Sequence, residues 1–262
     1  MKINTKNGEA AGASKFSSNG DVSGDSIALP RLDRALPFPE LPTKMIIAID
    51  GWAQTGKNST GELLAGHLGG VLVDSGRFYR AITKGCMDGE VDLMNMDAVA
   101  AWCRRATMDI RLARVVGVVE EVEVAVNGRW FTRGELSPLG LQTSLVAAVP
   151  QVREWVNAAL RLCECYGRVV MLGRDIGGAV FPKTPYKFFL DATEEVREQR
   201  HYATTKSFGA KKRDLFDASR VIFAEDSLLI DTSKLAVEEV CGIILVEVFW
   251  LSGQLKNHPS AP

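Results

Sequence analysis

The hydrophobic residues of this chain gather in short continuous runs that alternate with helical patterns. Residues 45–49 form the first run, and similar runs follow at residues 71–73, 169–172, 188–190 and 228–230. Short runs without polar alternation are typical of strands covered on both faces. This order predicts a doubly wound α/β fold, with residues 45–49 as the central strand of a parallel sheet.

One segment has a different period. Polar and apolar residues alternate over residues 121–126 and lead into Asn127-Gly128, the strongest short signal for a β-hairpin. A further strand is expected before it, over residues 110–116. We therefore predict an antiparallel hairpin within a small inserted domain over about residues 77–160.

The two ends of the chain differ in hydropathy. Residues 1–43 are rich in Gly, Ser, Asn, Asp and Pro and lack an apolar period, which predicts a disordered extension, with a docking motif as the alternative. Residues 44–262 then form the folded domain. The most apolar stretch, residues 240–251, contains Glu247 and is too short to span a bilayer, so we expect a buried terminal helix. Without a signal-peptide pattern, a cytoplasmic protein without a membrane anchor is expected.

Charge and cysteine content narrow the classes of function. The sequence has 31 Lys and Arg against 32 Asp and Glu residues, a net charge of −1, so long nucleic acid is not an expected partner. The five cysteines are an odd count without a CxxC pair, which favours reduced packing residues. Cys163 and Cys165 would form only half of a metal site, and histidine is scarce.

A glycine-rich segment directly follows the central strand and precedes a helical pattern. It reads Gly-Trp-Ala-Gln-Thr-Gly-Lys-Asn-Ser over residues 51–59. In this context backbone N–H groups turn inward, the helix N-terminus adds positive potential, and the ammonium of Lys57 reaches the β and γ phosphates of a nucleotide. The alternative is a glycine turn with an exposed lysine. The residues expected at the nucleotide are Gly51, Gln54, Thr55, Gly56, Lys57, Asn58 and Ser59.

Two positions depart from the usual phosphate-binding loop. Asn58 stands where a Ser or Thr hydroxyl normally joins the Mg²⁺ shell. Either Asn58 acts through its amide oxygen or a water, or the hydroxyl of Ser59 replaces it at the Mg²⁺. Gln54 takes the place of a glycine that is common in such loops.

Four further motifs follow along the chain. They are Asp-Ser-Gly-Arg-Phe-Tyr-Arg at residues 74–80, Ser-Leu-Val-Ala-Ala at 144–148 with Val-Arg at 152–153, Gly-Arg-Asp-Ile-Gly-Gly-Ala-Val-Phe-Pro at 173–182, and Arg-Asp-Leu-Phe-Asp-Ala-Ser-Arg at 213–220. The third follows an expected strand, at the sheet edge where open α/β folds bind ligands. In these motifs and in its phosphate-binding loop, the chain resembles the bacterial cytidylate kinases, collinearly from about residue 46 to residue 240.

The resemblance implies a site for an acceptor nucleotide. The implied contacts are Ser75 and Arg80 with the acceptor nucleotide, Ser144 and Arg153 with the cytosine carbonyl and ring nitrogen, Arg174 with the acceptor phosphate, Asp175 with the exocyclic amine, Arg213 with phosphate, Asp217 with the sugar and Arg220 with the base. A carboxylate at Asp175 suits the amine of cytosine and disfavours the carbonyl of uracil. The alternatives are a surface charge at Arg153, a buried ion pair of Arg174 with Asp175, and a solvated helix start at residues 213–220.

The resemblance also implies a fold and a reaction. The fold is a P-loop NTPase-type parallel sheet flanked by helices, with a lid over about residues 204–216. The reaction is transfer of the γ-phosphoryl group of ATP to CMP or dCMP, with Mg²⁺, by a monomer. Phosphoryl transfer needs alignment and charge neutralisation rather than a dedicated base. The catalytic residues would be Lys57, Arg174, Arg213 and Arg200, the last of these closing with the lid.

Two other functions stay open on the sequence. A kinase for another monophosphate, such as UMP, would use the same donor site. A non-catalytic descendant that only binds nucleotide is motivated by Asn58, Gln54 and a shortened lid, in which Phe216 stands where the family often has an arginine. A kinase for another monophosphate would form a diphosphate product with an acceptor other than CMP. A non-catalytic descendant would bind nucleotide without turnover.

Overall fold

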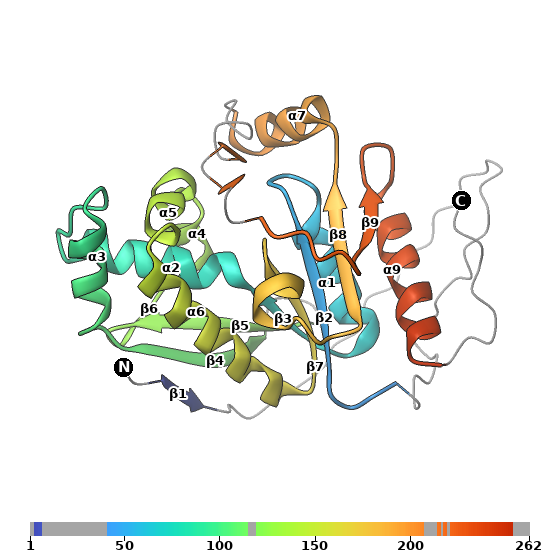
Figure 1. Cartoon of the computed structure of the whole chain (residues 1–262), viewed down its shortest axis with the longest axis horizontal. Coiled ribbons are helices and arrows are strands. Elements are labelled where there is room, and N and C mark those ends of the chain that lie inside the picture. Colours follow the sequence, from blue (N-terminus) through green and yellow to red (C-terminus); the bar gives the residue numbers. More distant parts are fainter. Residues whose placement is uncertain are drawn as a thin grey trace, which may run out of the picture.

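The computed structural model of the chain describes residues 3–6, 41–114, 119–206, 214–215, 217–218 and 221–253. Within these residues, nine strands form one sheet in the order β1-β4-β5-β3-β7-β2-β8-β9, with β6 paired to β5 (Figure 1). The strands are β1 (Ile3–Lys6), β2 (Met45–Gly51), β3 (Val71–Asp74), β4 (Met108–Arg114), β5 (Glu120–Val126), β6 (Arg129–Trp130), β7 (Arg168–Leu172), β8 (Tyr186–Asp191) and β9 (Leu228–Asp231).

Parallel strands form the centre of the sheet. β2 lies between β7 and β8, with Ile47 opposite Val170 on one side and Tyr186 on the other. β3 pairs with β7, and β9 with β8, in the same parallel sense. Each expected apolar run is one of these strands, so the prediction of an α/β fold with residues 45–49 in the central strand is confirmed.

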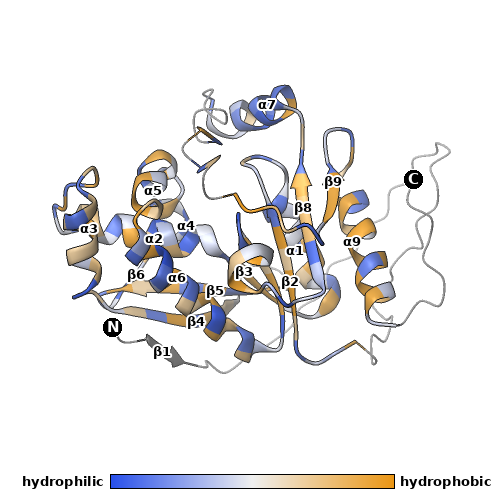
Figure 2. Ribbon diagram, viewed as in Figure 1, coloured by the Kyte–Doolittle hydropathy of each residue, from blue (hydrophilic) through white to orange (hydrophobic). Residues whose placement is uncertain are grey.

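Successive residues of the central strands point into two different hydrophobic cores. Ile46 belongs to one core and Ile47 to the other, and both are buried. Two-sided burial explains why these strands are apolar without alternation, as their orange colour in Figure 2 shows. The helices that cover the first core are α2 (Ser75–Asp88) and α6 (Pro150–Leu162), and those that cover the second are α1 (Lys57–Leu68) and α9 (Val237–Leu251).

The chain between α2 and α6 extends the sheet beyond β3. Besides β4, β5 and β6, it forms α3 (Met96–Cys103), α4 (Arg133–Leu136) and α5 (Gly140–Ala147). β5 is antiparallel to β4 and β6 but parallel to β3, so these strands continue the main sheet. The predicted hairpin is confirmed, because Asn127 and Gly128 have φ angles of 51° and 77°, the positive values that a type I′ turn requires.

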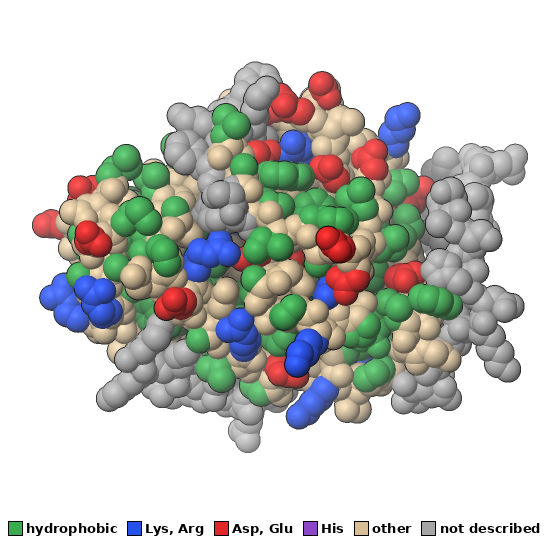
Figure 3. All heavy atoms as spheres, viewed as in Figure 1, with side chains coloured by type: hydrophobic (Ala, Val, Ile, Leu, Met, Phe, Trp, Pro, Cys, Tyr) green, Lys and Arg blue, Asp and Glu red, His purple; other side chains and the backbone are tan. Residues whose placement is uncertain are grey.

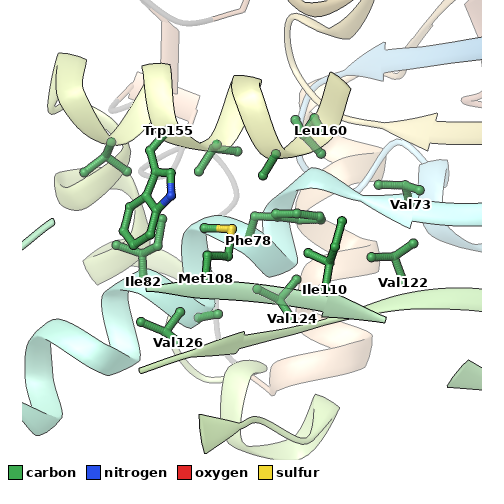
Figure 4. Close-up of a cluster of buried hydrophobic side chains, with 14 of the residues drawn as sticks. Val73, Phe78, Ile82, Met108, Ile110, Val122, Val124, Val126, Trp155 and Leu160 are labelled. Atoms are coloured by element: carbon green, nitrogen blue, oxygen red, sulfur yellow. The ribbon is translucent and has the colours of Figure 1, made fainter. Parts of the chain in front are cut away.

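The inner faces of β4 and β5 pack against α2 and α6 (Figure 4). Trp155 of α6, Phe78 of α2 and Met108 of β4 are all fully buried there. Burial of each such side chain contributes roughly 1.5–3 kcal/mol. This core fixes α6, which carries Arg153, on the same sheet as the central strands.

The N-terminal segment departs from expectation at two places. Residues 3–6 form β1, which pairs in parallel with β4, so the prediction of disorder is wrong for them. Leu41 is buried in the core beneath α1 and α9, and Arg168 donates to the carbonyl oxygens of Leu41 and Pro42 at 3.0 and 3.1 Å. Packed structure thus begins before residue 44. Residues 7–40 lie outside the described residues, and the bounds of the insert and lid remain predictions.

After α6 the chain forms the strands β7, β8 and β9, with β9 at one edge of the sheet. Its remaining elements are η1 (Cys163–Tyr166), η2 (Ile176–Val180) and α7 (Glu194–Thr205). The expected buried terminal helix is confirmed in α9, where Val240, Ile244 and Val248 are buried. In the described ranges, no helix is long and apolar enough to cross a membrane.

Basic and acidic side chains are interspersed over the described part of the face in Figure 3.

Candidate active site

The phosphate-binding loop leaves β2 at Gly51 and enters α1 at Lys57. Gly51 has a φ of +145°, and a Cβ at this position would lie 2.1 Å from the carbonyl oxygen of Leu190 in β8. Gly56, which precedes α1, has a φ of +92°, and no side chain among the described residues caps this helix. The first N–H groups of α1 are therefore available to an anion at the helix N-terminus.

The ammonium of Lys57 lies across the loop. Its Nζ donates to the carbonyl oxygen of Gly51 at 2.8 Å, to Thr55 Oγ1 at 3.3 Å and to the carbonyl oxygen of Trp52. Thr55 Oγ1 also donates to the Trp52 carbonyl, at 3.0 Å. Positive charge is thus held at the mouth of the loop, beside the helix N-terminus.

Arg174 connects the loop after β7 with the phosphate-binding loop. Its Nη1 donates to the carbonyl oxygen of Gly51 at 2.7 Å, and its Nη2 donates to Asp217 Oδ2 at 2.8 Å. The side chain is 18% exposed, so part of the guanidinium reaches solvent. A planar guanidinium that meets solvent beside a phosphate-binding loop can bind two oxygens of a second anionic group.

Two buried carboxylates, Asp175 and Asp217, bind further predicted acceptor residues. Asp217 accepts a hydrogen bond from Ser144 Oγ at 2.8 Å, and Asp175 accepts one from Arg153 Nη2 at 2.5 Å. Arg174 and Asp175, neighbours in sequence, thus have partners from distant parts of the chain. The predicted acceptor residues come from separate motifs of the sequence. Two ion pairs, Arg153–Asp175 and Arg174–Asp217, and the hydrogen bond of Ser144 with Asp217 connect these motifs in the structure.

Arg80 and Ser75 lie at the start of α2. Asp74 caps this helix by accepting from the N–H of Gly76 at 2.9 Å, and its Oδ2 pairs with Arg80 Nη1 at 3.2 Å. Burial acts to raise the pKa of Asp74, but the Arg80 guanidinium and the Gly76 N–H outweigh it and hold the pKa below its ordinary value. A Cβ on Gly173 would lie 3.0 Å from Ser75 Oγ, so the hydroxyl faces the loop that carries Arg174.

A pocket of about 330 Å³ joins the start of α1 to Arg80. Its lining includes Asn58 and Ser59 from α1, Asp74 and Arg80 from the β3–α2 junction, and Arg133 from α4. Asn58 and Ser59, whose side chains carry an amide and a hydroxyl oxygen, therefore line the same pocket as Arg80. Such oxygen donors fit Mg²⁺, which prefers hard oxygen ligands.

Arg200 contacts both the phosphate-binding loop and the segment after β9. Its Nη1 donates to the carbonyl oxygen of Gln54 at 3.3 Å, and its Nη2 donates to the carbonyl oxygen of Thr232 at 2.7 Å. Thr232 Oγ1 in turn donates to the carbonyl oxygen of Thr55 at 3.0 Å. Arg200 therefore supports the phosphate-binding loop from α7.

Other loop contacts from this region were not found by the sequence analysis. Asp214 Oδ1 accepts from the N–H of Ala53 at 3.3 Å, and Asp214 also pairs with Arg197 of α7. Gln54 Nε2 lies 3.2 Å from His201 Nδ1. The signal for Asp214 was its place inside the 213–220 motif, whereas His201 carries no pattern that a sequence alone would single out.

Asp50 is a further site residue that the sequence analysis missed. It immediately precedes Gly51 and is 4% exposed, and its carboxylate accepts from the N–H groups of Ile176 and Gly177, each at 2.8 Å. Burial raises the pKa of Asp50 to about 7, although these two N–H groups act to lower it. The available signal was an acidic residue at the end of an otherwise apolar strand. Arg213, Arg220 and most of the expected lid lie outside the described residues.

A parallel-sheet strand, a glycine loop and a helix in this order define a P-loop nucleotide-binding protein. The family model for cytidylate kinase matches residues 47–249, and the chain belongs to this family.

Cytidylate kinases from other organisms are similar to this chain over most of their length. A cytidylate kinase of Rhodococcus opacus (strain B4) is 34% identical, and the match covers 80% of this chain and 97% of that protein. A cytidylate kinase of Herpetosiphon aurantiacus is 33% identical, with coverage of 79% and 96%. Among solved structures, a gluconokinase from Sinorhizobium meliloti 1021 is 14% identical with a TM-score of 0.44, and the match covers 81% of this chain and 95% of that one.

Proposed function

We propose that the chain transfers the γ-phosphoryl group of ATP to CMP or dCMP. The observation that carries this proposal is the position of Arg174, which bonds to Gly51 of the phosphate-binding loop and to Asp217 of the acceptor cluster. A group in this position can hold an acceptor phosphate in line with the phosphates of ATP. Alignment of this kind supplies much of the rate enhancement in phosphoryl transfer.

The donor side consists of the loop amides, the N-terminus of α1 and Lys57. The ammonium of Lys57 is within reach of the loop carbonyls and can exchange these bonds for oxygens of the β and γ phosphates. Ser59 lines the same pocket as Asn58, and we assign its hydroxyl to the Mg²⁺ shell. The ion held there would supply positive charge that neutralises the phosphate groups.

The acceptor side uses residues from three parts of the chain. Arg80 and Arg174 are suited to the acceptor phosphate, because guanidinium groups bind phosphate oxygens in pairs. Arg153 and Asp175 are suited to cytosine, whose carbonyl and ring nitrogen accept hydrogen bonds and whose amine donates them. A uracil carbonyl in place of the amine would face the carboxylate of Asp175, which disfavours UMP.

The test is ADP release by the purified chain with Mg·ATP and CMP, dCMP, UMP, AMP or no acceptor. We expect ADP release with CMP or dCMP well above the other acceptors. Equal release with UMP would contradict the cytosine assignment of Asp175. Binding of ATP without release for any acceptor would replace the proposal with a nucleotide-binding protein that has lost turnover.

A further inference from the structure

Asp50 bonds the strand that begins the phosphate-binding loop to the loop that carries the acceptor residues. Its Oδ1 accepts from the N–H of Ile176 and its Oδ2 from the N–H of Gly177, each at 2.8 Å. These two N–H groups directly follow Asp175 in the chain. A single carboxylate thus fixes two consecutive peptide groups of the acceptor loop.

The next residue along β2 makes a second connection between the same two loops. The carbonyl oxygen of Gly51 accepts from Arg174 Nη1 at 2.7 Å. The end of β2 therefore holds the acceptor loop on both sides of Asp175, through the Arg174 side chain before it and the Ile176 and Gly177 backbone after it. An acceptor loop held at these points cannot shift relative to Gly51 without breaking a hydrogen bond.

A carboxylate is an unfavourable choice for this position on packing grounds alone. Asp50 is 4% exposed at the end of a strand whose other residues are buried and mostly apolar. Burial of a charge costs free energy unless it is paired or hydrogen-bonded, and here the pair of N–H donors offsets part of that cost. What distinguishes the carboxylate from an apolar or amide side chain is its ability to accept both N–H groups at once.

We propose that Asp50 is a positioning residue for phosphoryl transfer, which sets the acceptor loop at residues 174–177 in register with the phosphate-binding loop. It acts through Arg174 and Asp175 and does not itself touch either nucleotide. This inference rests on the proposed function, because the alignment it describes is that of an acceptor phosphate with ATP.

The first variant is Asp50→Asn, which keeps the size of the side chain but offers one acceptor oxygen and turns an NH₂ group toward the other N–H. We expect kcat with CMP to fall by about 10-fold to 10²-fold, because small misplacements of reacting groups cost rate on this scale. The Kd for ATP, measured by calorimetry without acceptor, should change less than about twofold, because the loop amides and Lys57 are untouched. Arg105→Ala, which replaces an exposed arginine after α3, is the control and should leave both kcat with CMP and the Kd for ATP unchanged.

A second variant disturbs the same contact from the other side. A Cβ on Gly177 would lie 3.2 Å from the Lys187 side chain and 3.5 Å from Asp50 Oδ2, so Gly177→Ala crowds the loop while keeping the carboxylate. We expect the same fall in kcat with ATP binding retained. If Asp50→Asn does not fold, Gly177→Ala alone tests the positioning role.

The outcomes separate the inference from the function on which it rests. A loss of ATP affinity equal to the loss of kcat, or no change in kcat for either variant, overturns the positioning role. If the unaltered chain does not phosphorylate CMP, the proposed function is wrong. The positioning role of Asp50 is then tested by the affinity of each variant for CMP. Weaker CMP binding with unchanged ATP binding in both variants supports positioning of the acceptor loop, and equal CMP binding overturns it.

Discussion

Lys57 and Arg174 donate hydrogen bonds to the same atom, the carbonyl oxygen of Gly51, at 2.8 and 2.7 Å. One side chain belongs to the predicted donor site and the other to the predicted acceptor site. Two cations on one carbonyl oxygen repel each other unless anions or dipoles compensate. The pair therefore concentrates positive charge beside Gly51, which favours anionic groups such as phosphates at this point.

The first prediction separates the roles of these two cations. Arg174→Ala should lower turnover with CMP by on the order of 10²-fold, because acceptor alignment is lost while the donor loop is intact. Lys57→Met should weaken ATP binding itself. Calorimetric titration with Mg·ATP, together with steady-state kinetics, distinguishes the two. Loss of ATP binding in Arg174→Ala would contradict the assignment.

The Arg153–Asp175 ion pair should contribute to both stability and acceptor binding. In Arg153→Ala, the buried carboxylate of Asp175 loses a guanidinium partner, and we expect the free energy of unfolding to fall by roughly 1–3 kcal/mol. The KM for CMP should rise more than the KM for ATP. Arg111→Ala removes the exposed pair with Glu123, and it should cost less than about 1 kcal/mol. Equal losses of unfolding free energy in the two variants, measured by urea unfolding, would show that the Arg153–Asp175 pair stabilises the fold no more than the exposed pair does.

Gly51 should not tolerate a side chain. In Gly51→Ala, the new Cβ would meet the Leu190 carbonyl oxygen at 2.1 Å, and the φ of +145° is unfavourable for any residue with a Cβ. We expect a loss of more than about 3 kcal/mol of unfolding free energy, or failure to fold. Gly134→Ala in α4, where the nearest atom is 4.0 Å away, is the control and should be neutral or stabilising by up to about 1 kcal/mol.

Stability should depend on pH through Asp50. Burial raises the pKa of this carboxyl from an ordinary 3.8 to about 7 in the folded chain. Between these values the folded state binds the proton and the unfolded state does not, so this group's contribution to stability is full at low pH and is lost as pH rises through about 7. In Asp50→Asn this part of the pH dependence should disappear. Urea unfolding at several pH values between 3.8 and about 7 measures how the free energy of unfolding changes with pH. An unchanged slope in Asp50→Asn would rule out Asp50 as the source of this pH dependence.

The sequence predicted those features that depend on neighbouring residues. Residues 45–49 were recognised as a buried strand because they are apolar without interruption, and the Asn127-Gly128 turn because its backbone angles demand those residues. The acceptor residues were recognised only through a resemblance, since the Ser144–Asp217 contact joins residues 73 positions apart.

Contacts between distant segments without a local pattern were not predictable in this way. Asp50 meets Ile176 across 126 positions, and nothing near Asp50 in the chain indicates an N–H partner. The resemblance implies that Arg200 closes with the lid, which stays a prediction, whereas its hydrogen bonds to the carbonyl oxygens of Gln54 and Thr232 had no local pattern to indicate them. The pairing of β1 with β4 is likewise a tertiary contact that the composition of residues 1–43 does not indicate.

The most direct test of the account is to follow the γ-phosphoryl group itself. The chain is incubated with Mg²⁺, CMP and ATP labelled at the γ-phosphate, and the products are separated by chromatography. We predict label in CDP for the unaltered chain and for Arg105→Ala, and little or none for Lys57→Met. Label that appears only as inorganic phosphate, or that stays in ATP although ATP binds, would contradict the claim that the two sites meeting at Gly51 carry out phosphoryl transfer.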